Sequence, residues 1–427
     1  MPPGGSATSG GRIKSLVGGS IGNLVEWYDW YVYSAFSLYF AASFFPAGDT
    51  TAQLFNAAGV FAIGFLMRPV GGWLLGVYAD KHGRKAALSL SVMLMAGGSL
   101  VVAVCPPFAS IGIVAPILLV LARLAQGLSV GGEYGASATY MSEMAVARHR
   151  GFFASFQYVT LISGQLIALA VLLLLQRWLT EAQLESWGWR IPFAIGSLAA
   201  LVALWLRRSI AETDAFEQTS EASRSGLFAR LWEHRRSAAL VIGLGAGGSL
   251  AFYTFTTYMQ KFLVNTAHWT KAEASLVSAG TLVVYMCIQP VFGALSDRIG
   301  RRPLLLAFGV LGVLGTVPVL TALSSVQSRT EGFVLILAAL TVLSCYTAIS
   351  GLVKAELFPA NVRALGVGLP YALSVSLFGG TAEYVALWFK SAGHEAGFFW
   401  YVTAMIAISL VVALILPDTR DASLIEG

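Results

Sequence analysis

The chain has 427 residues, of which 56% are hydrophobic and only 11% are charged, whereas soluble domains average about 25% charged residues. This composition excludes a single soluble domain and indicates a chain that lies largely in lipid, where helices or closed barrels satisfy the backbone. The net charge of +5 calls for no nucleic-acid partner, because the basic residues follow the pattern of membrane loops. No nucleotide-binding signature or metal-ligand spacing is present, so we expect no cofactor and no metal.

Apolar segments of about twenty residues or more recur along the chain and predict an all-α membrane protein with twelve transmembrane helices. The longest polar stretch, 207–237, divides them into two six-helix halves, 18–206 and 238–416. We expect an N-terminal tail at 1–17 and a C-terminal tail at 417–427. The expected spans are 18–45, 51–75, 86–106, 112–139, 152–176, 189–206, 238–262, 273–294, 303–323, 332–353, 365–389 and 397–416.

A charged motif that we expect to form a tight loop after the second span recurs after the eighth. Gly76-Val-Tyr-Ala-Asp80-Lys-His-Gly83-Arg84-Lys85 and Gly293-Ala-Leu-Ser-Asp297-Arg-Ile-Gly300-Arg301-Arg302 share the same spacing of glycine, aspartate, glycine and two cations. A second repeat places a glutamate seven residues before an arginine after the fourth and the tenth spans (Glu143 to Arg150 and Glu356 to Arg363). The repeats predict two halves related by an axis along the membrane normal, with a site between them at mid-membrane.

The distribution of cations predicts the orientation in the membrane. Most of the 27 lysines and arginines lie on the side of the N-terminus, which predicts that both termini are cytoplasmic. The cations of the opposite side are Arg177, Arg190, Lys261, Lys271, Arg329 and Lys390. Among these, we expect Lys261 and Lys390 to stand at the outer ends of helices and to extend their ammonium groups towards water.

Ionisable residues inside the spans are the first candidates for function, because a charge at the bilayer centre costs about 2.5–3.5 kcal/mol on insertion scales. The six candidates are Glu26, Asp29, Arg68, Arg123, Glu133 and Glu383. Glu26 and Asp29 share a helix face, and two close carboxylates beside one arginine do not both ionise cheaply. We therefore expect one acid to exchange protons and rank Asp29 first, Glu133 second and Glu26 third.

Each intramembrane arginine has more than one reading. Arg123 lies midway along the fourth span with Gln126 on its face. It either binds an anionic ligand bidentately, sets the protonation of an acid on the first span, or forms a static ion pair. Arg68 lies about 18 Å from Asp80 at roughly 1.5 Å per helical residue. It either holds a second carboxylate or neutralises Glu26 or Glu133.

Three further side chains are candidate hydrogen-bond donors to a ligand: Tyr28, Gln157 and Tyr253. Aromatic residues in membrane spans more often pack or anchor the helix at the interface, so packing is the competing interpretation for the two tyrosines.

Together, the repeated motif, the spans and the central loop resemble the major facilitator superfamily over nearly all of residues 12–416. In that superfamily the motif latches the two halves together on the cytoplasmic side. Segments around the candidate residues resemble its metabolite:proton symporter family. These are Gly22-Asn-Leu-Val-Glu26-Trp-Tyr-Asp29, Phe65-Leu-Met-Arg68-Pro, Arg123-Leu-Ala-Gln126-Gly127 and Gly131-Gly-Glu133-Tyr.

Two more segments, Tyr253-Thr-Phe-Thr-Thr-Tyr-Met-Gln260-Lys261 and Gly379-Gly-Thr-Ala-Glu383-Tyr, are similar to those of 2-oxoglutarate carriers in that family. The resemblance implies a monomeric carrier, not an enzyme, that imports a small dicarboxylate, 2-oxoglutarate, with protons by alternating access across a bacterial inner membrane. It also matches Tyr28-Asp29 and Arg123 to an acid–arginine link of the related sugar porters. Symport of citrate, shikimate or proline/betaine remains an alternative, as does a solute sensor that does not transport.

Overall fold

The computed structural model describes residues 9–82, 84–130, 147–208, 231–360, 362–420 and 422–425. Within these ranges the regular structure is helical and no strand occurs. The α-helices are α1 (Ser9–Phe44), α2 (Thr50–His82), α3 (Arg84–Val104), α4 (Phe108–Ile111), α5 (Val114–Ser129), α7 (Arg150–Trp178), α8 (Glu181–Gln183), α9 (Arg190–Arg208), α11 (Arg235–Phe252), α12 (Met259–Asn265), α13 (Lys271–Ile299), α14 (Arg302–Ser325), α15 (Arg329–Thr347), α16 (Ser350–Glu356), α17 (Arg363–Ser374), α18 (Ala382–Ser391) and α19 (Glu395–Ile415).

Many of these helices are long and apolar enough to cross a membrane. Among the described residues they form eight such segments, Thr50–Leu75, Arg150–Trp178, Arg235–Asn265, Lys271–Ile299, Arg302–Ser325, Arg329–Glu356, Arg363–Ser391 and Glu395–Ile415. Shorter apolar helical segments lie at Ser89–Val104, Val114–Ser129 and Arg190–Val202. The all-α membrane fold is thereby confirmed, whereas the count of twelve spans stays a prediction.

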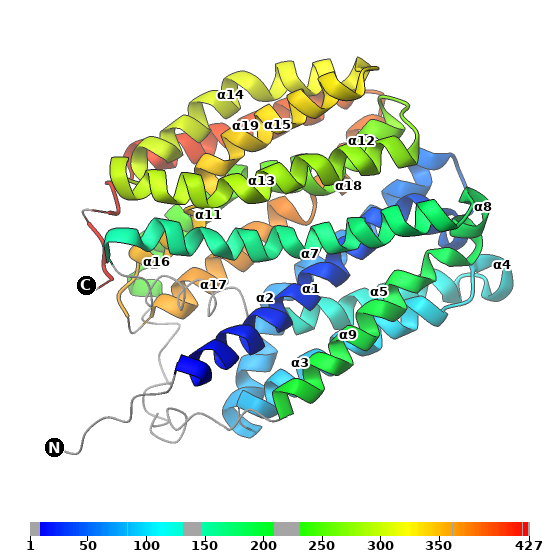
Figure 1. Ribbon diagram of the computed structural model, residues 1–427, viewed down its shortest axis with the longest axis horizontal. Coiled ribbons are helices and arrows are strands. Elements are labelled where there is room, and N and C mark those ends of the chain that lie inside the picture. The colour runs from blue at the N-terminus through cyan, green and yellow to red at the C-terminus, as the bar shows by residue number, and fades with distance from the viewer. Residues whose placement is uncertain are drawn as a thin grey trace.

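The helices form two sets, α1–α9 and α11–α19, that pack along a common seam (Figure 1). At this seam α7 of the first set lies beside α13 of the second, and α2 packs against α18. The close approach of α7 and α13 requires glycine, because a Cβ atom at Gly293 would lie 2.5 Å from the carbonyl oxygen of Gly151. Aromatic pairs add to the seam: the rings of Phe65 and Tyr253 lie 5.3 Å apart.

Most of the repeated motif is helical rather than the tight loop that we expected. In the second copy α13 continues through Asp297 to Ile299, and Gly300 ends it with a φ of +96°. A positive φ is disfavoured for residues with a Cβ atom, so glycine is suited to this turn. In the first copy α2 continues to His82, Gly83 lies outside the described residues, and nothing is described of the side chains of Asp80 and Arg84. We call the end where α13 turns into α14 the motif end.

Several expected spans are interrupted. A π-helical turn at Tyr253–Tyr258 joins α11 to α12, and another at Val375–Gly379 joins α17 to α18. The expected span 332–353 is broken between α15 and α16. π-helical turns inside membrane helices often mark functional positions, because they change which side chains share a face.

The first helix begins earlier than expected. α1 starts at Ser9, inside the segment 1–17 that we predicted to be a tail. No proline follows Pro3 until Pro46, so no proline prevents the residues before the apolar span from joining the helix.

Candidate functional site

The most deeply buried charges of the first helix set meet at one point. Arg123 on α5 and Asp29 on α1 are almost fully buried, and Nη1 of Arg123 lies 3.6 Å from Oδ2 of Asp29. Gln126 joins the pair: it donates to Asp29 at 2.5 Å and accepts from Arg123 at 2.7 Å. The hydroxyl of Ser99 donates to the other oxygen of Asp29. The carboxylate is therefore held inside the membrane by one cation and two neutral donors.

Glycines on two neighbouring helices bring this cation close to a second one. A Cβ atom at Gly127 on α5 would lie 2.1 Å from the carbonyl oxygen of Gly64 on α2, so the two backbones touch. Small residues allow such contact between membrane helices. Arg68 follows Gly64 by four residues and Arg123 precedes Gly127 by four, so the two arginines start about one turn to either side of the contact, and both side chains reach Trp30.

Both arginines lie against the same indole ring. The Cζ atom of Arg123 is 4.0 Å, and that of Arg68 is 4.5 Å, from the ring centroid of Trp30 on α1. Arg68 also lies 3.8 Å from the ring centroid of Phe65. A cation–π contact contributes about 2 kcal/mol or more when it is desolvated, which helps to hold two like charges near one another in a buried place.

The two guanidinium groups keep donors that no protein group uses. Within the described part of the chain, Nε and Nη2 of both Arg68 and Arg123 are buried and make no hydrogen bond. Buried donors without a partner cost about 1–3 kcal/mol each. An anion placed between these groups would satisfy them, and a planar carboxylate matches the guanidinium fork.

The seam adds a tyrosine and a second acid to this region. Tyr253 begins the π-helical turn of the second helix set, and its ring lies 5.3 Å from that of Phe65, three residues before Arg68. Glu26 is buried on α1. Tyr253 therefore stands where α2 faces the second set, and the parts predicted for Arg68, Glu26 and Tyr253 at a shared site stay predictions.

The remaining sequence candidates lie elsewhere. Tyr28 donates its hydroxyl to the carbonyl oxygen of Pro192 at 3.0 Å and so links α1 to α9. Gln157 is buried on α7, and no hydrogen bond joins it to Arg68 or Arg123 within the described ranges. Glu133 lies outside the described residues, so its predicted part in proton exchange stays a prediction.

A small polar cavity lies between the helix sets beside this cluster. Its volume is about 10 Å³, which is room for about one water molecule. Its lining residues are Tyr31, Ser34, Ala35, Gln165, Leu169, Thr256, Thr257, Gln260 and Ser278. Gln165 donates across the seam to the carbonyl oxygen of Thr256 in the π-helical turn at 2.9 Å. A larger apolar pocket of about 100 Å³ among α11, α14, α15 and α19 is lined by no ionisable side chain.

Sequence reasoning was wrong about Lys261. The lysine does not extend to water: it is fully buried, pairs with the buried Glu383 on α18, and donates to the hydroxyl of Ser34 on α1 at 2.6 Å. Its place near the end of an expected span suggested an interfacial residue.

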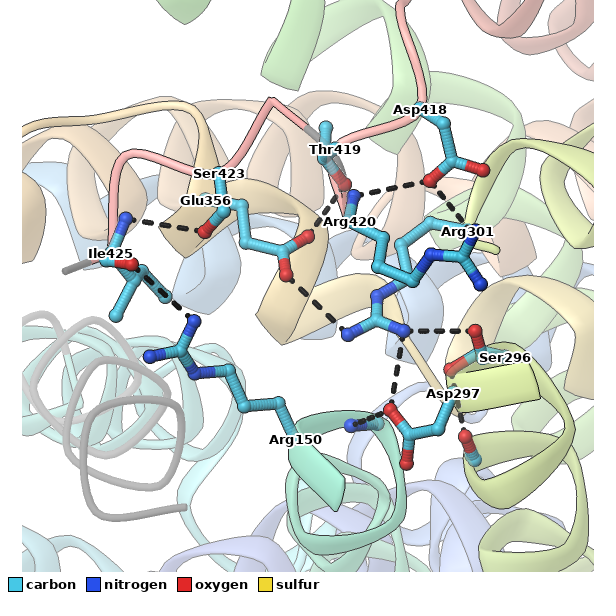
Figure 2. A network of polar contacts seen from close by, with 12 residues as sticks. Arg150, Ser296, Asp297, Arg301, Glu356, Asp418, Thr419, Arg420, Ser423 and Ile425 are labelled. Carbon is cyan, nitrogen blue, oxygen red and sulfur yellow. Dashed lines mark hydrogen bonds and ion pairs between the residues drawn. The ribbon is translucent and has the colours of Figure 1, made fainter. Parts of the chain in front are cut away.

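The second copy of the motif joins the two helix sets at the motif end. Asp297 accepts backbone N–H groups of Gly151 and Phe152, in the first turn of α7, at 2.8 and 2.9 Å. The N-terminus of a helix carries free N–H groups and a partial positive charge, so a carboxylate suits it. Arg301 holds the same carboxylate at 3.1 Å. This arrangement closes the seam at the motif end (Figure 2).

The C-terminal segment covers the same end (Figure 2). Thr419 donates to Glu356 at 2.5 Å, and Glu356 lies 3.5 Å from Arg301. The carbonyl oxygen of Ile425 accepts from Arg150 of the first set at 3.3 Å. The segment therefore touches both helix sets, and Glu356 and Arg150, which the sequence repeat singled out, belong to one network.

At the opposite end the seam holds a hollow of about 640 Å³, which reaches Leu38 and Tyr39 on α1 and Lys271 on α13. Lys271 bridges the sets there through Glu181 and Glu185, at 2.8 and 2.6 Å. Water and solutes therefore have more room at this end than at the closed motif end.

Comparisons with known proteins agree with this architecture. The sequence model of the Major Facilitator Superfamily matches residues 19–369 and 249–426. The chain is 58% identical over 405 residues to the alpha-ketoglutarate permease of Escherichia coli (strain K12), covering 95% of this chain and 94% of the relative. It is 34% identical over 386 residues to the citrate-proton symporter of Klebsiella pneumoniae, covering 89% and 86%.

Among solved structures, the crystal structure of a D-xylose-proton symporter superposes with a TM-score of 0.73 at 19% identity, covering 96% of this chain and 98% of the other. This likeness concerns the fold. The expected location in an inner membrane is confirmed by the transporter relatives and the apolar helices. The chain belongs to the Major Facilitator Superfamily, a family of membrane transporters rather than enzymes.

Proposed function

We propose that the protein imports a small dicarboxylate, 2-oxoglutarate, together with protons by alternating access. The observation that carries the proposal is the pair of buried arginines, Arg68 and Arg123, which share one indole ring and keep unused donors. Two guanidinium groups suit a solute with more than one anionic group better than a zwitterion. The relative named as an alpha-ketoglutarate permease supports this choice of solute.

Asp29 is the proposed coupling group. In the present arrangement its charge is balanced by Arg123 at 3.6 Å. When a carboxylate of the solute binds Arg123, Asp29 loses this balance, and a buried carboxylate without a cation favours its protonated form. Solute and proton then cross together, with less net charge exposed to the membrane.

The proposed topology has twelve spans and places the motif end in the cytoplasm. α1 begins at this end and the C-terminal segment returns to it (Figure 1). Arg298, Arg301 and Arg302 lie there as well, in agreement with the excess of cations on cytoplasmic loops. The halves are 18–206 and 238–416, joined by a cytoplasmic loop at 207–237 and flanked by cytoplasmic tails at 1–17 and 417–427. We propose that the carrier works as a monomer.

Uptake of labelled 2-oxoglutarate into proteoliposomes tests the proposal. With an inward proton gradient we expect accumulation above the outside concentration, and a protonophore should abolish it. Unlabelled citrate, shikimate and betaine serve as competitors, and stronger competition by one of them would reassign the solute. A sensor would bind 2-oxoglutarate without flux, so tight binding with no uptake would contradict the proposal.

A further inference from the structure

A buried ion pair of the second helix set touches the first set beside the proposed site. Lys261 on α12 and Glu383 on α18 form this pair, with side chains 1% and 5% exposed. Lys261 also donates to Ser34 on α1 at 2.6 Å. The charged and titratable groups near Glu383 are Lys261, Tyr33 and Tyr258, so Lys261 is the cation that balances it.

The first helix relates this pair to the two arginines. Trp30, which contacts Arg68 and Arg123, precedes Ser34 by four residues. Residues four apart lie on the same helix face, about 6 Å apart along the axis. Two guanidinium groups of the first set and one ammonium group of the second set therefore meet the same face of α1, about one turn apart.

The polar cavity lies next to Lys261. Ser34, which accepts from Lys261, also lines the cavity, as does the neighbouring Gln260. Two other lining atoms, Oε1 of Gln165 and Oγ of Ser278, are buried and make no hydrogen bond within the described part of the chain. The cavity has room for a single polar group, which would satisfy them and would lie close to the lysine.

Lysine suits an exchange of partners. Its ammonium group is a compact charge on a flexible stem and binds whichever carboxylate is presented to it, whereas arginine is fixed by its planar fork. Removing one partner of a buried ion pair is strongly unfavourable, because the other charge stays unbalanced. An incoming carboxylate that takes the place of Glu383 avoids this cost.

We propose that Lys261 is the anchor of the second helix set for one carboxylate of the transported diacid, and that Glu383 is its counter-ion while no solute is bound. This inference rests on the proposed function and names the group of the second set that the solute contacts. A diacid held by an arginine of the first set and by Lys261 links the two sets, whereas a monoacid reaches one of them.

The decisive variant is Lys261→Gln combined with Glu383→Gln, which removes both charges and leaves neither buried alone. We expect the KM for 2-oxoglutarate to rise about 10- to 100-fold, the range for a hydrogen bond to a charged group. Inhibition by 2-oxobutyrate, which lacks the second carboxylate, should stay unchanged. Lys261→Arg should keep part of the affinity. Arg329→Gln, which removes an exposed cation paired with Glu273, is the matched control and should transport normally.

Each outcome bears on the inference. A double variant with normal KM and normal discrimination between diacid and monoacid would show that the pair is only structural. If the double variant does not fold, Lys261→Arg decides, because it keeps a cation beside Glu383. Its affinity for 2-oxoglutarate should fall while inhibition by 2-oxobutyrate stays unchanged, and unchanged affinity for both would overturn the inference. Absence of 2-oxoglutarate uptake by the natural protein would instead refute the proposed function.

Discussion

Replacing Asp297 by alanine should open the motif end. The substitution removes the acceptor of two N–H groups of α7, at 2.8 and 2.9 Å, which are direct bonds between the two helix sets. The contact with Arg301 lies within the second set, so it persists when the sets separate and does not count towards opening.

The expected size of the effect follows from these two bonds. A hydrogen bond to a charged group contributes about 1.5–3 kcal/mol, and neighbouring bonds to one carboxylate do not add fully. We therefore expect a loss of about 3 kcal/mol from the closed arrangement. At 1.4 kcal/mol per factor of ten, the population with an open motif end should rise about 100-fold.

A buried reporter can measure this change. Ser155 on α7 is fully buried. A Cβ atom added to Gly293 on α13 would lie 2.9 Å from the Cβ atom of Ser155, so the two helices are in contact there. In a background with the three natural cysteines changed to serine, Ser155→Cys places a thiol in the seam. Its alkylation by a maleimide in nanodiscs should be about 100-fold faster when Asp297→Ala is added.

Asp418 provides the matched control. It also accepts backbone N–H groups at the start of a helix, from Arg301 at 3.0 Å and Arg302 at 3.4 Å, but both lie in its own helix set. Asp418→Ala should therefore leave the alkylation rate nearly unchanged. Equal rates in the parent and the Asp297→Ala protein would show that Asp297 does not hold the seam closed.

Three more outcomes are expected. Arg123→Lys should lower 2-oxoglutarate uptake at least about 100-fold, because lysine lacks the planar fork; uptake within threefold of normal would exclude bidentate binding. Asp29→Asn should abolish proton-driven accumulation and keep exchange of internal for external solute, and persistent gradient-driven accumulation would exclude Asp29 as the coupling group. Gly127→Ala should lower the unfolding free energy by about 1–3 kcal/mol, because its Cβ atom would meet Gly64 at 2.1 Å. Gly97→Ala, with no atom within 4 Å, is its control in thermal unfolding.

The positions of the helices were readable from the sequence because lipid demands long apolar runs. The expected spans 273–294 and 303–323 correspond to α13 (Lys271–Ile299) and α14 (Arg302–Ser325). The observed helices are longer, because polar residues beyond the apolar run continue to make helical hydrogen bonds. Apolar length therefore locates a helix but does not locate its ends.

The interruptions and the seam contacts were not readable in this way. The π-helical turn at Tyr253–Tyr258 changes the hydrogen-bond register without changing hydropathy, so no apolar pattern reports it. Lys261 was misplaced for a related reason: its burial depends on Glu383 and Ser34, which are distant in the chain. The contact of Arg123 with Asp29 was one of the expected alternatives, because both residues lie near the middle of their spans.

The placement of charges along α1 bears on how binding and movement are connected. Within one and a half helical turns α1 carries Asp29, which faces Arg123, Trp30, which contacts both arginines, and Ser34, which accepts from Lys261. A shift of α1 therefore changes every one of these contacts at once. A solute is coupled to a conformational change when both of them alter the position of the same structural element. In the proposed mechanism α1 is that element. A bound diacid draws an arginine away from Asp29, and it draws Lys261 away from Glu383. It therefore acts on α1 from both helix sets.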